Sequence, residues 1–289
     1  MIDLHTHTTA SDGALTPREL VERAYGLGIR TLSVTDHDTL AGVPEAAVAA
    51  AARGMEFLPG IEITAVHQGR DVHVLAYFLD PLPAGLAPFL ERQRQDRSRR
   101  AREMSARLAA LGAPIDMEEL IAGAEAAGTA VARPTVARAL LDAGHVTSLQ
   151  QAFDRWLADG RPAYVPRIGA SPAEVVRLVM RSGGAAVLAH PGLLRRDGLI
   201  PELAEAGLAA IEAYHSDHDA GAQSRYLRLA ELYDLAVSGG SDFHGDDHPR
   251  ARCFGRVGLP RARFRPLFQR VRQAHAVVHE EPSRPEAAP

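Results

Sequence analysis

The sequence of 289 residues contains no lysine and no asparagine, so arginine supplies every formal positive charge other than histidine. Schiff-base chemistry at a lysine and the lysine of a phosphate-binding P-loop are therefore excluded. Cys253 is the single cysteine, which excludes an internal disulfide, a cysteine-based zinc finger and an iron–sulfur cluster. Any metal that the chain binds must use nitrogen and oxygen ligands.

Long apolar runs and a strong net charge are also missing. No apolar run approaches about 18 residues, and no basic segment precedes an apolar one at the amino terminus, so we expect a cytoplasmic protein without a membrane partner. The net charge of −4 offers no broad basic surface for duplex DNA, and no obligatory protein partner is indicated. The composition is that of a folded globular protein, and only residues 280–289 are expected to form a disordered tail.

Short apolar stretches alternate with amphipathic stretches in both halves of the chain. The expected strands lie at residues 2–5, 31–35, 57–64, 72–78, 185–189, 209–214 and 235–238. This alternation predicts parallel β–α–β units and an α/β barrel. The middle of the chain is mostly helical and shows no clear strand. The expected domains are a first barrel segment at residues 1–94, a small helical insertion at 95–165 and a second barrel segment at 166–279.

Two histidines, His5 and His7, stand at the end of the first expected strand. Residues two apart on an extended segment point to the same side, so both imidazoles can reach one ion. By itself the pair fits a solvated or structural role equally well. Asp12 follows in a Ser-Asp-Gly turn and adds a carboxylate to the same region.

The run Asp36-His37-Asp38 directly follows another apolar strand. Burying three ionisable side chains is costly unless they are paired or bind metal, although an acidic loop that caps the next helix would also fit the run. Acids and histidines stand beside further strands, and the carboxyl ends of barrel strands share one mouth, so these side chains should converge. The candidate metal ligands are His5, His7, Asp12, His37, Glu62, His73, His190, Asp242 and His244.

Five motifs resemble those of the PHP (polymerase and histidinol phosphatase) superfamily. They are His5-Thr6-His7, the Thr-Asp-His-Asp-Thr run at residues 35–39, Gly60-Ile61-Glu62, Ala189-His190-Pro191 and Ser241-Asp242-Phe243-His244. The resemblance covers nearly the whole chain and is greatest to the stand-alone TrpH/YciV-type branch. Members of that branch act as nucleoside 3′,5′-bisphosphate phosphatases, as AMP phosphatases or as 5′-to-3′ exonucleases on short RNA.

The resemblance implies a trinuclear metal site in a distorted (β/α)7 barrel. It assigns His5, His7, Glu62 and Asp242 to one ion, with Glu62 bridging to a second ion. The second ion would also take His73 and His190, and the third ion would take Asp12, His37 and His244. Several PHP enzymes have histidine where Asp12 stands, so this third site is richer in oxygen. Manganese and iron then become as suitable as zinc, and magnesium less so.

The resemblance also implies that metal-bound water, rather than a side chain, is the nucleophile. A hydroxide bridging two ions and held through Glu62 would attack phosphorus in line, and His215 and Asp36 are candidate acid–base groups beside it. Arg133 and His215 are candidate substrate contacts. Arg133 precedes Pro134 at an expected helix start, where backbone donors favour an anion, although a plain helix-start arginine fits as well. His215 also fits a loop histidine bonded to backbone.

The expected activity is that of a metal-dependent phosphoric ester hydrolase acting on nucleoside 3′,5′-bisphosphates, on short RNA from its 5′ end, or on both. An AMP or histidinol-phosphate phosphatase and a non-catalytic, metal-stabilised module remain as alternatives. Metal-dependent amidohydrolases usually bring a lysine-derived bridge, and this chain has no lysine. The arginines at positions 92–102 favour a solvated helix face over an RNA-binding surface, because acids are interleaved with them.

Overall fold

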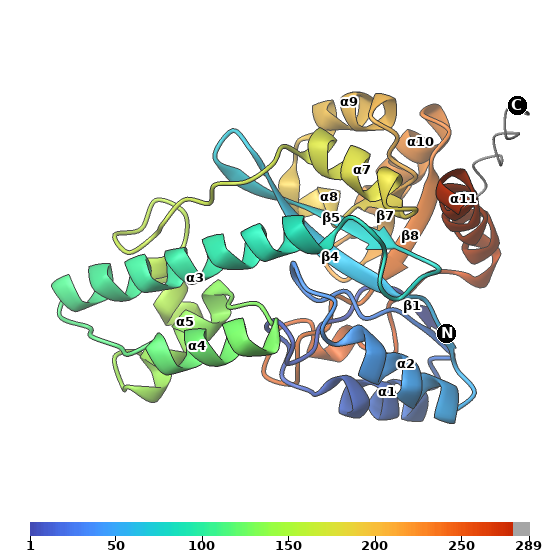
Figure 1. Cartoon of the computed structure of the whole chain (residues 1–289). Coiled ribbons are helices and arrows are strands. Elements are labelled where there is room, and N and C mark those ends of the chain that lie inside the picture. The colour runs from blue at the N-terminus through green and yellow to red at the C-terminus, as the bar shows by residue number, and fades with distance from the viewer. Residues whose placement is uncertain (280–289) are drawn as a thin grey trace, which may run out of the picture.

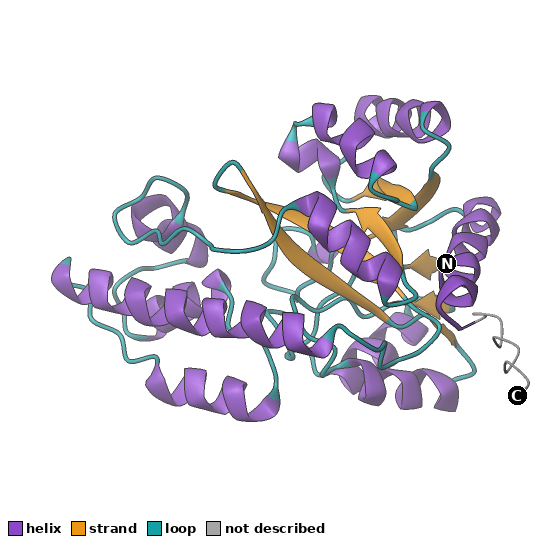
Figure 2. Cartoon of the chain, turned by 45° about the horizontal axis from the view of Figure 1, so that its top comes forward, coloured by secondary structure: helices purple, strands orange, loops and turns teal. Residues whose placement is uncertain are grey.

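Two sheets form the centre of an α/β fold, and helices cover their outer surfaces (Figures 1 and 2). The structure is a computed structural model that describes residues 1–279, and the tail expected at residues 280–289 lies outside the described residues. One sheet has the order β1-β2-β3, and the other has the order β4-β5-β6-β7-β8. The strands are β1 (Ile2–Asp3), β2 (Thr31–Leu32), β3 (Glu56–Phe57), β4 (Gly60–His67), β5 (Arg70–Tyr77), β6 (Ala185–Leu188), β7 (Ala210–His215) and β8 (Ala236–Gly240).

Bridges at two places join the sheets into a distorted ring. His37, beyond the end of β2, pairs with Glu62 of β4, and Thr6, beyond the end of β1, pairs with Phe243 after β8. Only two residues separate β3 from β4, so these strands occupy one position in the ring. Within residues 1–279 the ring therefore has seven strand positions, and the expected fold class of a distorted barrel with a helical insertion is confirmed.

The hairpin β4–β5 departs from the parallel alternation expected from the sequence. Its strands are antiparallel and are joined by Gln68 and Gly69, which have φ values of 50° and 75°. Two consecutive residues at positive φ are typical of a tight turn whose twist matches that of the flanking strands. Because β5 is also antiparallel to β6, His73 near the start of β5 lies beside the end of β6, next to His190.

Helices outside the insertion cover the barrel and begin at recognisable signals. Thr16 and Glu19 form a reciprocal capping box at the start of α1, and Ser171 and Glu174 do the same for α7. Within residues 1–279, no helix is both long and apolar enough to cross a membrane. The helices that cover the barrel are α1 (Pro17–Gly26), α2 (Val43–Ala52), α7 (Pro172–Arg181), α8 (Pro191–Leu194), α9 (Ile200–Glu205), α10 (Ala220–Leu232) and α11 (Arg261–His279), with short 3-10 turns η2 (Asp197–Leu199) and η3 (Ala251–Cys253).

The helical stretch forms a lobe that projects to one side of the sheets, opposite α11 (Figure 1). It packs around its own apolar cluster, which includes Leu108, Ile121 and Trp156. The helix α3 spans the expected boundary at residue 95, because Leu90 packs in the barrel core while Leu108 packs in the lobe. The elements of the lobe are α3 (Ala87–Ala110), α4 (Glu118–Ala127), α5 (Arg133–Asp142), α6 (Leu149–Ala152) and the π-helical turn η1 (Phe153–Leu157).

Loops at the barrel mouth hold the lobe in place. Thr39 donates its hydroxyl to the Gly128 carbonyl over 2.7 Å, and the Ala130 amide donates to the Ala10 carbonyl over 3.0 Å. On α3, Gln93 donates to the Thr64 carbonyl over 2.6 Å. The lobe therefore contacts the segments that follow β1 and β2, which also carry candidate metal ligands.

Gly240 sits where β8 passes close to β1, and replacing it with alanine should disturb the mouth. A Cβ atom there would lie 2.4 Å from the His5 backbone nitrogen. Gly240→Ala should therefore lower the free energy of unfolding by about 1–3 kcal/mol, and thermal denaturation should show a Tm lower by a few degrees. Gly123→Ala in α4 is the control, since nothing lies within 4 Å of its added Cβ and its Tm should stay equal or rise. An unchanged Tm for Gly240→Ala would contradict the close approach.

Candidate metal centre

The nine side chains expected to bind metal meet at the mouth of the barrel. Each belongs to at least one group of three or more histidine and carboxylate atoms that lie within 4.8 Å of one another. The side chains of the first pair, His5 and His7, are fully buried. The groups are His5, His7 and Glu62; His5, His190 and Asp242; His37, Glu62 and His73; His7, Asp12, His37 and His244; and a further group that adds Glu212 and His215 to His5.

Glu62 lies at the centre of the cluster, and its two oxygens face different histidines. The side chain is 1% exposed. On one side, Oε1 lies 2.8 Å from His73 Nδ1 and 3.0 Å from His190 Nε2. On the other side, Oε2 lies 3.2–3.3 Å from nitrogens of three histidines, His5, His7 and His37. A carboxylate with this geometry can bridge two ions.

Asp242 and Asp12 complete the carboxylate set on either side of His7. Asp242 Oδ1 lies 3.4 Å from His5 Nε2 and 3.2 Å from His7 Nε2. Asp12 Oδ1 lies 3.6 Å from His7 Nδ1 and 3.4 Å from His244 Nε2, and its Oδ2 lies 3.7 Å from His37 Nε2. Asp12 therefore takes part in a separate group of donors at the edge of the cluster.

Buried imidazole nitrogens test whether this cluster fits metal ions. Several make no hydrogen bond even though carboxylate oxygens lie 2.8–3.6 Å away, and an unsatisfied buried polar atom normally destabilises a protein. A divalent cation would satisfy these nitrogens and the carboxylates together, so the donor set fits metal binding. The orphaned atoms are His5 Nε2, His7 Nδ1 and Nε2, His37 Nδ1 and His73 Nδ1.

The electrostatics of the cluster also favour cations. Burial opposes ionisation of Glu62 and Asp242, but the surrounding histidines hold the pKa of both carboxyls well below the usual range. Burial lowers the pKa of His37 to about 3 and of His190 to about 4, so both rings are neutral near pH 7, the form that binds metal. Around His7, burial acts downward but carboxylates outweigh it and raise the pKa to about 10.

Two buried acids behind the cluster were missed by the sequence reasoning. Glu212 of β7 is fully buried, and its Oε1 lies 3.0 Å from His5 Nδ1 while its Oε2 accepts from the His190 amide over 2.7 Å. A carboxylate on the far nitrogen of a ligating histidine fixes the ring so that Nε2 faces the metal. Asp3 accepts from the Ser241 amide over 2.9 Å, and burial raises its pKa to about 6. The signal in both cases is an acid inside an apolar strand.

His215 and Asp36, the candidate acid–base groups, lie in different places. His215 is buried, and its Nε2 lies 3.2 Å from Asp242 Oδ2, directly beside the cluster. Asp36 accepts from the Thr8 amide over 2.7 Å, from the Thr8 hydroxyl over 2.6 Å and from the Ser11 hydroxyl over 2.7 Å. These contacts hold the turn that precedes Asp12.

Arginines form the next layer of the mouth. Arg97 of α3 donates to Asp38 Oδ2 over 2.6 Å, and Arg167 Nη1 lies 3.5 Å from the same oxygen. Arg167 Nε lies 3.5 Å from one oxygen of Asp71, and Arg133 Nη2 lies 3.6 Å from the other. Two acids of the barrel thus hold three arginines that come from the lobe and from the segment after it.

Arg133 lies at the mouth, where a substrate contact requires it. Its side chain is 25% exposed, and Nη1 donates to Asp159 over 3.0 Å. A cavity of about 360 Å³ runs from the histidines of the cluster to the arginines. Its lining includes Asp12, His37, His73, Arg97, Arg100, Arg133, Phe153, Arg167 and Arg250. Arg250, which the sequence reasoning also missed, donates to Asp242 Oδ2 over 2.6 Å.

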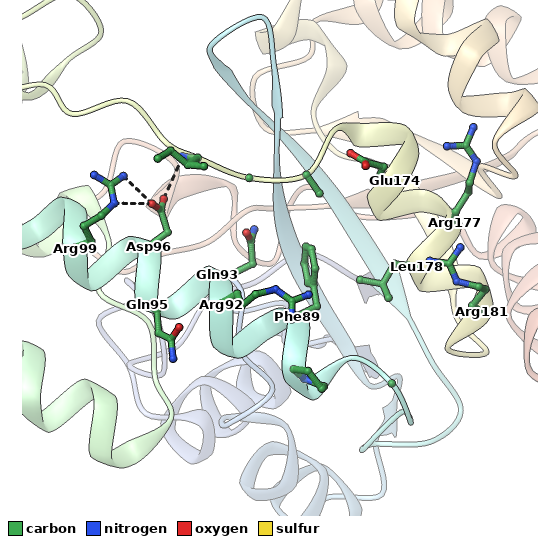
Figure 3. A pocket seen from close by; sticks show the side chains of 15 residues that line it. Phe89, Arg92, Gln93, Gln95, Asp96, Arg99, Glu174, Arg177, Leu178 and Arg181 are labelled. Carbon is green, nitrogen blue, oxygen red and sulfur yellow. Dashed lines mark hydrogen bonds and ion pairs between the residues drawn. The ribbon is translucent and has the colours of Figure 1, made fainter.

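The arginines of α3 divide between two faces of the helix. Arg97 and Arg100 are buried toward the cavity, while Arg99 pairs with Asp96 on the outer face. A separate groove of about 730 Å³ lies between α3 and α7, and its lining includes none of the nine clustered residues. In this groove Arg92 of α3 lies beside Phe89, and Arg181 of α7 lies on the opposite side, beyond Leu178 (Figure 3).

Comparison with known proteins identifies the family. Residues 3–122 match the PHP domain family. A 3′,5′-nucleoside bisphosphate phosphatase from Chromobacterium violaceum is 36% identical over 250 residues, which cover 84% of this chain and 87% of that protein. The chain belongs to the PHP superfamily.

Two further relatives agree with this assignment. The 5′-3′ exoribonuclease Rnm of Escherichia coli is 34% identical over 251 residues, which cover 84% of each chain. A solved structure from Bifidobacterium adolescentis, assigned to the metal-dependent phosphoesterases, superposes with a TM-score of 0.84 at 34% identity and covers 93% of this chain and 95% of that chain. This PHP protein is therefore a metal-dependent hydrolase of phosphoric esters.

Glu62 is the side chain whose loss should affect this PHP site most, because it faces histidines on both sides. Glu62→Gln should bind fewer metal ions per chain than the wild type, and turnover should fall by more than about 100-fold. The loss should exceed that of His73→Ala, which removes a ligand from one side only. Metal analysis by mass spectrometry and phosphate release measure the two effects, with Glu119→Gln on the exposed face of α4 as control. Wild-type metal content in Glu62→Gln would contradict the bridging role.

Proposed function

We propose that the chain removes phosphate from nucleoside 3′,5′-bisphosphates and that the same site cleaves short RNA from its 5′ end. One observation carries this proposal: a buried cluster of six histidines and three carboxylates opens into a cavity lined by arginines. Metal-binding donors suit the phosphate that reacts, and arginines suit further phosphate oxygens. The names of the relatives, a bisphosphate phosphatase and an exoribonuclease, support the same substrate class.

We propose that the cluster holds up to three divalent ions, with manganese, iron or zinc as the suitable metals. His5, His7, Glu62 and Asp242 would hold the first, and Glu62 would share the second with His73 and His190. Asp12, His37 and His244 would hold the third. Divalent ions at these positions supply positive charge for phosphate oxygens and lower the pKa of water.

The protein groups around the cluster set its orientation. Glu212 holds the His5 ring, and His215 holds the second oxygen of Asp242, so neither metal-facing side chain is free to turn. We assign His215 a positioning role because it is buried behind Asp242 and does not line the cavity. Phe153 also lines the cavity and offers an aromatic ring on which a nucleobase can stack.

Removing the metal should abolish activity, and the choice of substrate tests the proposal. After dialysis against a chelator the protein should release no phosphate from adenosine 3′,5′-bisphosphate, and Mn²⁺ should restore the activity, because all candidate ligands are nitrogen or oxygen. The panel should include AMP, histidinol phosphate and 5′-phosphorylated short RNA. Histidinol phosphate as the best substrate would overturn the nucleotide proposal, and full activity after metal removal would overturn the mechanism.

Arg133 should contribute to the binding of nucleotides but not to that of a minimal ester. Arg133→Ala should lower kcat/KM for adenosine 3′,5′-bisphosphate by about 10- to 100-fold, the value of a charge-assisted contact of roughly 1.5–3 kcal/mol. Hydrolysis of p-nitrophenyl phosphate should change far less. Arg102→Ala on α3 is the matched control, because this exposed arginine pairs with Glu118 and Glu125 away from the cluster. Equal losses on both substrates would place Arg133 on the reacting phosphate instead.

A further inference from the structure

Arg100 of α3 is buried in the wall of the cavity beside the metal cluster. Its residue is 3% exposed, and its Nε donates to the Val165 carbonyl over 3.0 Å. Its Nη2 is buried and has no hydrogen-bond partner. Among the described residues no carboxylate forms an ion pair with Arg100. A buried charge left unpaired is costly, and burial indeed lowers the pKa of this guanidinium below its usual value.

The neighbouring acids are already engaged by other arginines. Asp38 lies against Arg97 and Arg167, and Asp71 lies against Arg167. Asp71 also faces Arg133 on its other oxygen, at 3.6 Å. Five arginines and two acids, Asp12 and Asp71, line this cavity, so its wall carries more positive than negative charge. Among the described residues, Arg100 is the arginine of this wall that pairs with no carboxylate. Nε of Arg167 also lacks a hydrogen bond, but that side chain faces Asp38 and Asp71.

The position of Arg100 relative to the metal cluster limits what this anion can be. The cavity of about 360 Å³ is lined by His37, His73 and Asp12 of the cluster and also by Arg100. A phosphate bound at the histidines and carboxylates would leave room in the same cavity for the rest of a nucleotide. A second phosphate of that nucleotide would then meet Arg100.

We propose that Arg100 binds the phosphate of the substrate that is not hydrolysed and so selects nucleotides with two phosphates. The assignment rests on the proposed function, because it requires a phosphate ester at the metal cluster. It differs from a role for Arg133, whose guanidinium is held by Asp159 and Asp71 and is partly exposed. Arg100 is a specificity-determining residue. Because its buried charge has no carboxylate partner in the free protein, this selectivity lowers the stability of the fold.

Replacing Arg100 by methionine should separate binding from stability. Methionine keeps an unbranched apolar stem and removes the charge. Without ligand, Arg100→Met should have a Tm equal to or higher than that of the wild type, because removing an unpaired buried charge does not destabilise the fold. Its kcat/KM for adenosine 3′,5′-bisphosphate should fall by about 10- to 100-fold, whereas the value for a monophosphate that the wild type hydrolyses, AMP or adenosine 3′-monophosphate, should change less than about threefold.

The matched control is Arg92→Met on the outer face of the same helix, where the side chain points into the groove of Figure 3. It should leave both kinetic values unchanged. Calorimetric titration of the full chain with adenosine 3′,5′-bisphosphate after dialysis against a chelator, when no turnover is expected, provides an independent readout, and the affinity of Arg100→Met should be weaker by on the order of tenfold. If the wild type binds this nucleotide through Arg100 but hydrolyses none of the panel, the proposed function fails while the Arg100 site stands.

Three results would overturn the Arg100 site. Equal losses on bisphosphate and monophosphate would place Arg100 on the reacting phosphate. A lower Tm together with parallel losses on all substrates would make Arg100 a structural support of the lobe through its bond to Val165. Unchanged affinity and unchanged kinetics would show that no phosphate reaches it.

Discussion

The burial of three carboxylates at the barrel mouth is the constraint on which the rest of the structure depends. Asp12, Glu62 and Asp242 are removed from water, and such groups persist only where cations or donors surround them. Six histidines supply the surroundings, yet several of their nitrogens have no partner of their own. Divalent ions would satisfy both sets at once, and their binding would then stabilise the folded mouth. Glu62 connects the two sides of the cluster because its two oxygens face different histidines.

The same compensation of charge attaches the helical lobe to the barrel. Asp38 directly follows His37 in the loop after β2, and its carboxylate holds Arg97 of α3 over 2.6 Å. The backbone amide of Asp38 donates to the Glu62 carbonyl over 2.9 Å, while that of Thr64 donates to the Asp38 carboxylate over 2.8 Å. A shift of α3 would therefore move the loop that carries His37 and that is hydrogen-bonded to Glu62. The lobe therefore helps to position the candidate metal ligands.

Sequence reasoning found the nine clustered residues because strand periodicity and barrel geometry place the ends of strands together. His73 was found for a different reason than expected, since it faces the mouth through an antiparallel hairpin. The sequence could have indicated Glu212, because an acid inside an apolar strand needs a buried partner. The sequence could not indicate Arg100 in the same way. Arginines occur on all sides of α3, and the packing of this helix against residues 165–167 decides which of them are buried. The boundary expected at residue 95 falls inside α3, and this helix packs in the cores of both the barrel and the lobe.

Backbone strain indicates how far the mouth is organised before a substrate arrives. Asp38, His190 and Asp242 have φ values of 54°, 25° and 53°, a region that residues other than glycine rarely adopt and that costs about 1–3 kcal/mol each. Each strained residue is held by its own backbone amide, which donates to another group of the mouth: the Glu62 carbonyl, the Glu212 carboxylate and the His5 carbonyl. Hydrogen bonds to residues at the ends of neighbouring strands therefore hold these three conformations, and the backbone sets the directions of the side chains. The arginines of the cavity wall, by contrast, are held by the side chains of Asp38, Asp71 and Asp159, and a substrate phosphate can compete with these carboxylates for them.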